Sequence, residues 1–129
     1  MKRPCLLDSS FVIDLLNELA DGVAGPAMAW LRNNPRARLW ISPVTYAEVL
    51  EGAENADAVR EHLQRYRWQG LHHIHAEMAA LLQRRSPQRM GENDAWQAAA
   101  ALAMQGVVVG HDPKAFGRLG DAYLDHRPD

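Results

Sequence analysis

The residues best able to do chemistry are four acids from distant parts of the chain: Asp8, Glu48, Asp94 and Asp112. Like charges about 4 Å apart repel by about 4 kcal/mol per pair at an effective dielectric constant near 20, so a cluster of carboxylates needs protons or a divalent cation. Because carboxylates offer only oxygen, such a cluster suits Mg²⁺ or Mn²⁺ better than Zn²⁺. The chemistry expected of it is the hydrolysis of phosphate esters.

Two of these acids each follow a short apolar run that is typical of a buried strand. Asp8 follows residues 5–7, and Asp112 comes soon after residues 107–109. Strands separated by helices predict a parallel, doubly wound α/β sheet, in which ligands bind at the carboxyl ends of the strands. This topology would bring both acids to the same edge. Each could instead be only the N-cap of the following helix, and both roles stay open.

The other two acids are expected on helices that pack against the sheet. Glu48 stands one turn after Val44 and borders the buried face. A half-buried carboxylate without a partner costs several kcal/mol or shifts its pKa, which either a cation or a salt bridge to an arginine would prevent. Asp94 opens an alanine-rich helix, and Ala98 and Ala101 on its side predict close packing. Asp94 could also simply favour the positive end of the helix dipole.

Apolar periodicity and the proline and glycine breaks predict the elements that must position these acids. We expect strands at 5–7, 39–41 and 107–109, a last edge strand near 123–124, and either a short strand or a connector at 71–74. One helix is expected to begin at Ser9 or Ser10. Further helices are expected at 26–32, 44–52, 56–68, 76–85 and 93–105.

Length and composition limit the possible classes of protein. A chain of 129 residues predicts one domain, 1–129, and the single Cys5 excludes an intrachain disulfide. A net charge of −2 argues against a wholly basic nucleic-acid-binding protein. The longest uncharged run, 95–110, is broken by Gly106 and is too short for a membrane span. With no apolar stretch typical of a signal peptide near Met1, we expect a cytoplasmic protein that does not bind membranes.

Taken together, the segments around the four acids resemble the PIN-domain ribonucleases, specifically the VapC-type toxins of bacterial toxin–antitoxin pairs. The resemblance spans nearly the whole chain and rests on Leu7-Asp8-Ser9-Ser10, on the segment from Ser42 to Gly52, on Asn93-Asp94-Ala95-Trp96 and on the segment from Val107 to Phe116. It implies a PIN-like three-layer α/β/α domain with a central, mainly parallel twisted sheet of four to five strands.

The same resemblance implies an activity and a set of partners. The four acids would form a catalytic, metal-binding quartet in which Asp8 and Asp94 are the most direct ligands, with Ser10 and Asn93 as supporting polar groups. The implied protein is a Mg²⁺-dependent endoribonuclease toxin, with Mn²⁺ as a possible substitute, that cleaves RNA such as tRNA or rRNA. A cognate antitoxin would neutralise it, and two copies would form a homodimer.

Two positions depart from the pattern of this family. Gln97 stands where an aliphatic residue is usual, and we expect this change only to adjust packing. Gly110-His111 replaces the usual threonine plus a basic or polar residue just before Asp112. A catalytically degenerate PIN domain that binds RNA or protein is the alternative, and the presence of all four acids argues against it.

Other candidate groups have weaker support. Arg84, Arg85 and Arg89 could contact RNA phosphates or could be a solvated helix face, and His111 could contact substrate. His72, His73 and His75 suggest zinc, but no matching Cys or His pair is present elsewhere. A phosphatase of the haloacid-dehalogenase type would need a second acid two residues after Asp8, and a response-regulator receiver would need an acid pair before the first helix. The sequence has neither.

Overall fold

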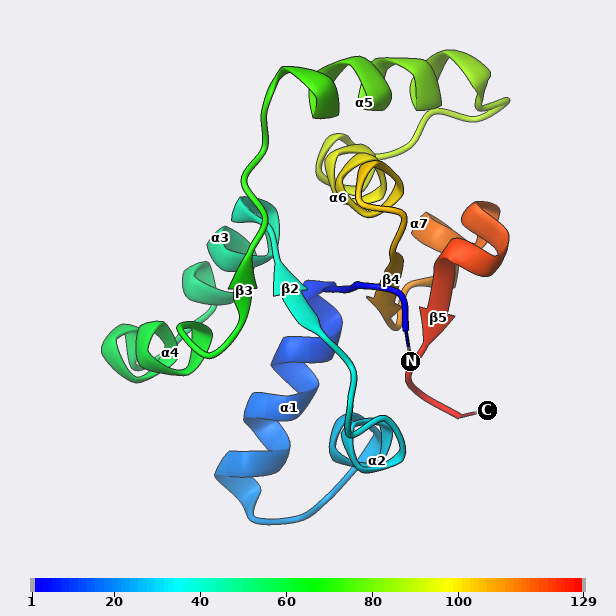
Figure 1. Cartoon of the computed structure of the whole chain (residues 1–129). Coiled ribbons are helices and arrows are strands. Elements are labelled where there is room, and N and C mark those ends of the chain that lie inside the picture. The colour runs from blue at the N-terminus through cyan, green and yellow to red at the C-terminus, as the bar shows by residue number, and fades with distance from the viewer. Residues whose placement is uncertain (1, 129) are drawn as a thin grey trace.

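A parallel five-stranded sheet forms the centre of the molecule (Figure 1). The structure is a computed structural model and describes residues 2–128. The strand order is β3-β2-β1-β4-β5, and all four neighbouring pairs are parallel. The strands are β1 (Cys5–Leu7), β2 (Leu39–Ile41), β3 (Arg67–Trp68), β4 (Val107–Gly110) and β5 (Tyr123–Asp125). The predicted parallel α/β sheet is therefore confirmed, including its edge strand at 123–124.

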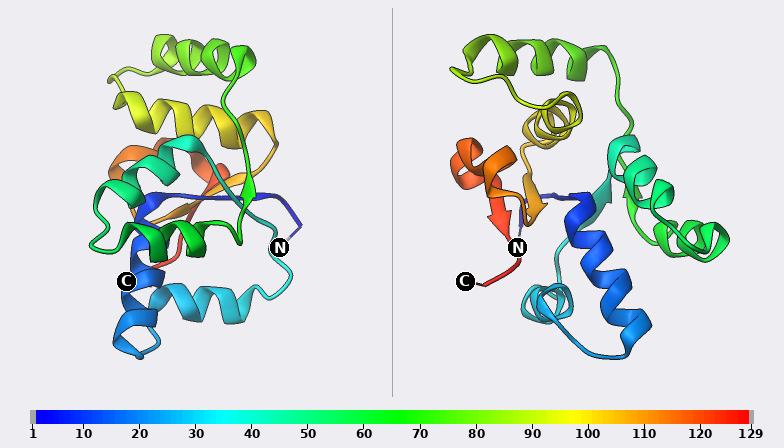
Figure 2. Two further views of the ribbon diagram at one scale, coloured as in Figure 1. Left: turned by 90° about the vertical axis from the view of Figure 1, so that its left-hand side faces the viewer. Right: turned by 180° about the vertical axis from the view of Figure 1, so that it is seen from behind.

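Helices cover both faces of this sheet and form three layers (Figure 2). They are α1 (Ser9–Asp21), α2 (Pro26–Asn33), α3 (Pro43–Glu51), α4 (Ala56–Leu63), α5 (His73–Arg85), α6 (Glu92–Ala103) and α7 (Pro113–Phe116), followed by a 3₁₀ helix, η1 (Gly117–Ala122). Helices α1 to α4 pack on one face, and α6 and α7 pack on the other. Helix α5 lies outside α6 (Figure 1). No helix within residues 2–128 is both long and apolar enough to cross a bilayer.

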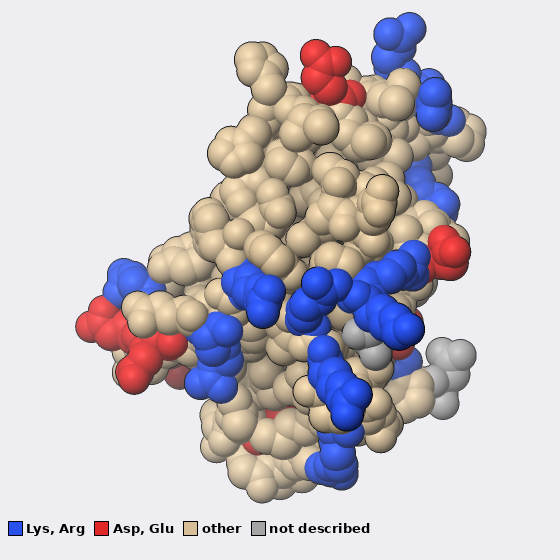
Figure 3. Space-filling model, in the orientation of Figure 1, with Lys and Arg blue, Asp and Glu red and all other residues tan. Residues whose placement is uncertain are grey.

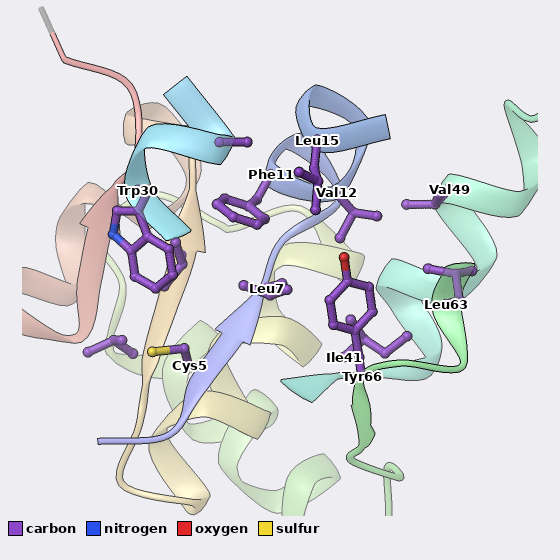
Figure 4. Packing of buried hydrophobic residues seen from close by; sticks show 13 residues of the cluster. Cys5, Leu7, Phe11, Val12, Leu15, Trp30, Ile41, Val49, Leu63 and Tyr66 are labelled. Atoms are coloured by element: carbon purple, nitrogen blue, oxygen red, sulfur yellow. The ribbon is translucent and has the colours of Figure 1, made fainter. Parts of the chain in front are cut away.

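The alternation of side chains along the strands builds two separate cores. Cys5 and Leu7 on β1 point to the face that α1 covers, where they join Phe11 and Val12 (Figure 4). Leu6 points to the opposite face, against the small alanines of α6. All of these side chains are fully buried. Burial on both faces explains why β1 is a continuous apolar run. Packing on both sides also holds the end of β1 in place, and with it the next residue, Asp8.

Two of the expected elements differ from the structure. The helix predicted over 56–68 ends at Leu63, and Arg67 pairs with Trp40 as the start of β3. Pairing with β3 satisfies the backbone groups on the outer side of β2, which would lack a partner if the helix continued to Trp68. The possible strand at 71–74 is absent, because α5 begins at His73, three residues earlier than expected. The backbone N–H of His72 donates to Nδ1 of His75 at 2.9 Å and supports this early start.

A buried histidine on α4 makes the stability of this face depend on pH. Nε2 of His62 lies 2.7 Å from the Tyr66 hydroxyl, and both side chains are buried. Burial, helped by the Arg65 guanidinium, lowers the pKa of His62 from 6.5 to about 4. The folded state therefore disfavours the protonated ring, so its contribution to stability is complete above pH 6.5 and is lost as the pH falls toward 4.

We expect the midpoint of urea unfolding to fall between pH 7 and pH 4.5, and to fall less in His62→Gln. The glutamine can still bond to Tyr66 but does not titrate in this range. Equal pH dependence in the two proteins would contradict the assignment to His62.

Candidate functional site

Asp8 leaves the carboxyl end of β1 and begins α1. Its side chain is only 6% exposed, and its Oδ2 accepts hydrogen bonds from the Ser10 hydroxyl at 2.7 Å and from the Ser10 N–H at 3.4 Å. The N-cap role left open by the sequence is therefore realised. Within the described residues, Oδ1 of Asp8 accepts no hydrogen bond from the protein, so it is available to a ligand.

Asp112 lies at the same edge, after β4, and begins α7. Its Oδ1 accepts the N–H of Ala115 at 3.1 Å, and its own N–H donates to the Tyr123 hydroxyl at 3.1 Å. Tyr123 belongs to β5, so the edge strand helps to hold the backbone of Asp112. As in Asp8, one carboxylate oxygen of Asp112 caps a helix. The other, Oδ2, accepts no hydrogen bond from the described residues.

The pKa of Asp94 reveals that the four acids share one electrostatic environment. Asp94 is half-buried in the first turn of α6. Burial raises its pKa most, and the negative charges of Asp112, Asp8 and Glu48 raise it further, while Arg118 acts in the opposite direction. Four acids that are up to 104 positions apart in the sequence are thus brought to one end of the sheet.

Glu48 lies half-buried on α3. In the described part of the chain it makes no ion pair, so the alternative of a salt bridge to an arginine is not realised. Its charge instead adds to the negative potential at Asp94.

The acids suit a divalent cation in donor type and charge, but they are not arranged as a finished ligand set. Among residues 2–128, no three His, Cys, Asp or Glu side chains converge closely enough to hold one ion. Burial and then the charges of the neighbouring acids raise the pKa of Asp94, and a cation would neutralise those charges. Because Asp8 and Asp112 also cap helices, a cation would be held through their second oxygens.

A hollow of about 220 Å³ beside Asp94 and Asp112 is bordered by cations. Arg89, Lys114 and Arg118 line it, and Arg118 donates to the Gln88 carbonyl at 2.7 Å. Sequence reasoning identified Arg89 as a possible RNA contact but missed Lys114 and Arg118. The signal available was their position, two and six residues after Asp112, on the turns that this acid begins.

Of the other predicted RNA contacts, the two arginines of α5 lie away from the acids and His111 lies beside them. Arg84 and Arg85 are exposed at the end of α5 and do not line the hollow beside the acids. His111 donates its backbone N–H to the Ser10 hydroxyl oxygen at 2.8 Å, and its ring Nδ1 lies 3.0 Å from both carboxylate oxygens of Asp125. The side chain of His111 is therefore held against β5, next to the acids.

Asn93, predicted as a supporting polar group, is exposed and faces a separate hollow with Val44 and Trp96 on its wall.

The histidines that suggested zinc do not form a metal site in the described chain. His75 is buried, burial lowers its pKa, and its Nδ1 is used to receive the backbone N–H of His72. No cluster of three potential ligands includes these residues within 2–128. Their role in this structure is to begin α5.

A buried hydrogen-bond network connects the three elements that carry Asp8, Glu48 and Asp94. Gln97 Nε2 donates to the Thr45 hydroxyl oxygen at 2.8 Å, and the Thr45 hydroxyl donates to the Leu7 carbonyl, also at 2.8 Å. The Ser42 hydroxyl donates to Gln97 Oε1. All three polar side chains are at most 1% exposed.

The positions of these groups give the network its significance. Gln97 is one turn from Asp94, Thr45 is one turn from Glu48, and Leu7 precedes Asp8. The expectation that Gln97 would only adjust packing is therefore wrong, because its amide bonds the helices α3 and α6 to each other.

We expect Gln97→Leu to lower the free energy of unfolding by about 1–3 kcal/mol. The leucine preserves most of the side-chain volume but leaves the buried Ser42 hydroxyl without its acceptor. Urea denaturation measures the effect, with the exposed Gln64→Leu as control, which should change stability by less than about 0.5 kcal/mol. Equal effects of the two substitutions would show that the network does not stabilise the fold.

Comparison with known proteins agrees with this fold and identifies the family. An α/β domain with acids at the carboxyl edge of a parallel sheet is matched by the model of the PIN domain family, over residues 5–122. The chain belongs to the PIN domain family. A comparison with curated protein sequences gives no match.

Solved structures share the fold at low sequence identity. The chain is similar to a protein in a toxin–antitoxin complex from Klebsiella pneumoniae, with 20% identity and a TM-score of 0.80 over 97% of this chain and 99% of that one. It is also similar to a chain of VapBC-1 from nontypeable Haemophilus influenzae (22%, TM-score 0.67, 95% and 97%) and to one of FitAcB from Neisseria gonorrhoeae (18%, 0.76, 95% and 97%). The predicted PIN-like fold is confirmed.

Proposed function

We propose that this protein is a metal-dependent endoribonuclease, the toxin of a toxin–antitoxin pair, in which the four acids hold Mg²⁺. The observation that carries the proposal is the placement of acids at the carboxyl edge of the sheet, where Asp8 follows β1 and Asp112 follows β4. Burial raises the pKa of Asp94, and the charges of the other three acids raise it further. A site that gathers uncompensated negative charge at the carboxyl edge of a parallel sheet suits a divalent cation. Mn²⁺ has the same preference for oxygen and is expected to substitute.

Each acid has a distinct role in this proposal. Asp8 and Asp94 are the principal ligands, Glu48 binds the ion or orients the attacking water, and Asp112 completes the site. A divalent cation supplies Lewis-acid stabilisation of charge on the phosphate and makes water a stronger acid. Ser10 holds the Asp8 carboxylate in place through its hydroxyl.

The cations around the neighbouring hollow would position the substrate. Lys114 and Arg118 line the same hollow as Asp112 and Asp94, so they would contact the phosphates next to the scissile bond. In-line attack by water would then leave a 5′-phosphate and a 3′-hydroxyl.

The proposed partners follow from the complexes in which the similar chains were solved. The similar chains from Klebsiella pneumoniae and Haemophilus influenzae were solved as toxin–antitoxin and VapBC assemblies. We therefore propose a cognate antitoxin that covers the acids, and a homodimer of this chain. Mixing with the antitoxin should abolish cleavage.

The first experiment is cleavage of total bacterial RNA, including its tRNA and rRNA, by the purified protein with Mg²⁺, with Mn²⁺ and with EDTA. Discrete products in the presence of either metal but not in EDTA would establish the activity, and end-labelling would identify the 5′-phosphate. A folded, antitoxin-free protein that binds RNA but leaves it intact under all three conditions would instead identify a binding module.

A further inference from the structure

A second charged surface lies at the opposite edge of the sheet from the acids. The three neighbouring strands β1, β2 and β3 are each preceded or begun by two exposed cations. We call these six residues the basic edge: Lys2, Arg3, Arg36, Arg38, Arg65 and Arg67. Because adjacent strands are parallel, their amino ends meet at one edge, just as the acids meet at the other. Figure 3 shows Lys and Arg side chains gathered across the middle of this face.

Contacts within the basic edge hold its side chains without neutralising them. Arg38 donates to the Lys2 carbonyl at 2.5 Å, and the Arg67 guanidinium lies 5.7 Å from the centre of the Trp40 ring. Arg3 donates to the Asp121 carbonyl, and Arg65 donates to that of His62 at 3.1 Å. None of the six forms an ion pair with a carboxylate in the described part of the chain.

Three other arginines of the molecule are neutralised by an acid. Arg60, Arg89 and Arg127 each form an ion pair, whereas the six cations of the basic edge form none in the described part of the chain. A cluster of unpaired cations in a chain of net charge −2 creates a local positive potential that attracts a polyanion. Neighbouring strands are about 4.8 Å apart, so the three strand starts present cations over about 10 Å, enough for several consecutive phosphates.

We propose that the basic edge binds the phosphate backbone of RNA, on the side of the domain away from the acids. Five of the six cations are arginines, whose planar guanidinium matches phosphate geometry. An acidic protein partner would be expected to need apolar anchors at the centre of its interface, whereas backbone binding requires only charge.

This inference rests on the proposed nuclease function and narrows its substrate class. The four residues of β4 alone span about 13 Å, so one RNA must be large to contact both edges of the sheet. A folded RNA presents phosphates at this separation without the conformational entropy that a flexible single strand would lose on being ordered. The basic edge would therefore favour structured RNA without touching the scissile bond.

The test compares two double variants of equal charge. Arg36→Gln/Arg38→Gln removes two unpaired arginines of the basic edge. Arg60→Gln/Arg127→Gln removes two arginines that are each paired with an acid. Thermal unfolding verifies that both fold. Binding of bulk bacterial tRNA and of a uridine decamer is measured in EDTA, at several salt concentrations, so that no cleavage occurs.

We expect the first variant to bind tRNA about 10-fold more weakly, with the slope of log Kd against log salt reduced by about two, and the second to change by less than about threefold. The decamer should bind the parent protein more weakly than tRNA does, and it should also bind the first variant less well, because the basic edge contacts phosphates. Equal loss in both variants, or none in the first, would overturn the proposal. Retained tRNA binding by the first variant with loss of binding to poly-glutamate would assign the surface to an acidic protein instead.

The outcome also separates this proposal from the nuclease assignment. If parent protein never cleaves RNA but its tRNA affinity depends on the basic edge, the nuclease proposal fails and the surface stands. If it cleaves RNA and the first variant binds and cleaves tRNA like the parent, the reverse holds.

Discussion

Asp94→Asn should lower the rate of Mg²⁺-dependent RNA cleavage at least about 100-fold. Asparagine has nearly the same shape but carries no charge, so it removes one of the two principal ligands of the proposed cation. The matched control is Glu92→Gln on the same helix, whose carboxylate is exposed and paired with Arg89. This control should cleave RNA at close to the parent rate. Equal losses in both variants would contradict the assignment of Asp94.

The stability of the same variant should change in the opposite sense to its activity. The pKa of Asp94 is raised in the fold, so the ionised carboxylate opposes folding as the pH rises through that pKa. In EDTA at pH 7, Asp94→Asn should therefore be at least as stable as the parent. Added Mg²⁺ should raise the melting temperature of the parent and not that of the variant, because a ligand stabilises only a state that binds it. A destabilised variant would indicate a structural role instead.

Gly110→Ala should have the second large effect, on activity and stability together. A Cβ at this position would lie 2.6 Å from Cβ of Asp8 and 2.8 Å from the Ser10 hydroxyl oxygen. These atoms must move, which disturbs the bonds from Ser10 to Asp8 and from the His111 N–H to Ser10. We expect a loss of about 1–3 kcal/mol in the free energy of unfolding and at least about 10-fold in cleavage.

Gly117→Ala provides the control for that substitution. Its backbone has ordinary helical angles and a Cβ there meets no atom within 4 Å, so stability should be unchanged or slightly increased. If Gly110→Ala cleaved RNA like Gly117→Ala, the close fit around Asp8 would have no bearing on catalysis. Asp8 and Ser10 fill the space that a side chain would need at position 110, which explains why glycine stands before His111 in this chain.

Most of the architecture could be predicted because it depends on local patterns. Residues 5–7 and 107–109 are short apolar runs between breaks, and parallel strand order then places Asp8 and Asp112 at one edge. The end of α4 was missed because the helical pattern continues to Tyr66, while pairing of Arg67 with Trp40 is a tertiary contact. The number of domains and the roles of the acids remain predictions.

What the sequence concealed depends on contacts between distant residues. Gln97 looked like a packing change because its partners, Ser42 and Thr45, are more than 50 positions away. The basic edge is invisible along the chain, since its members occur as separate pairs near residues 2, 37 and 66. Only the order of the strands brings them together.

The central position of β1 also determines when the site can exist during protein synthesis. This strand is made before the other four, yet it pairs with β4, so Cys5 can meet Val107 only after the intervening residues have been synthesised. Ser10 and His111, which bond beside the acids, are 101 residues apart. Such long-range pairing is slow compared with local helix formation. A nascent chain that has not yet released β4 therefore lacks the complete acid site, because Asp112 is not yet beside Asp8.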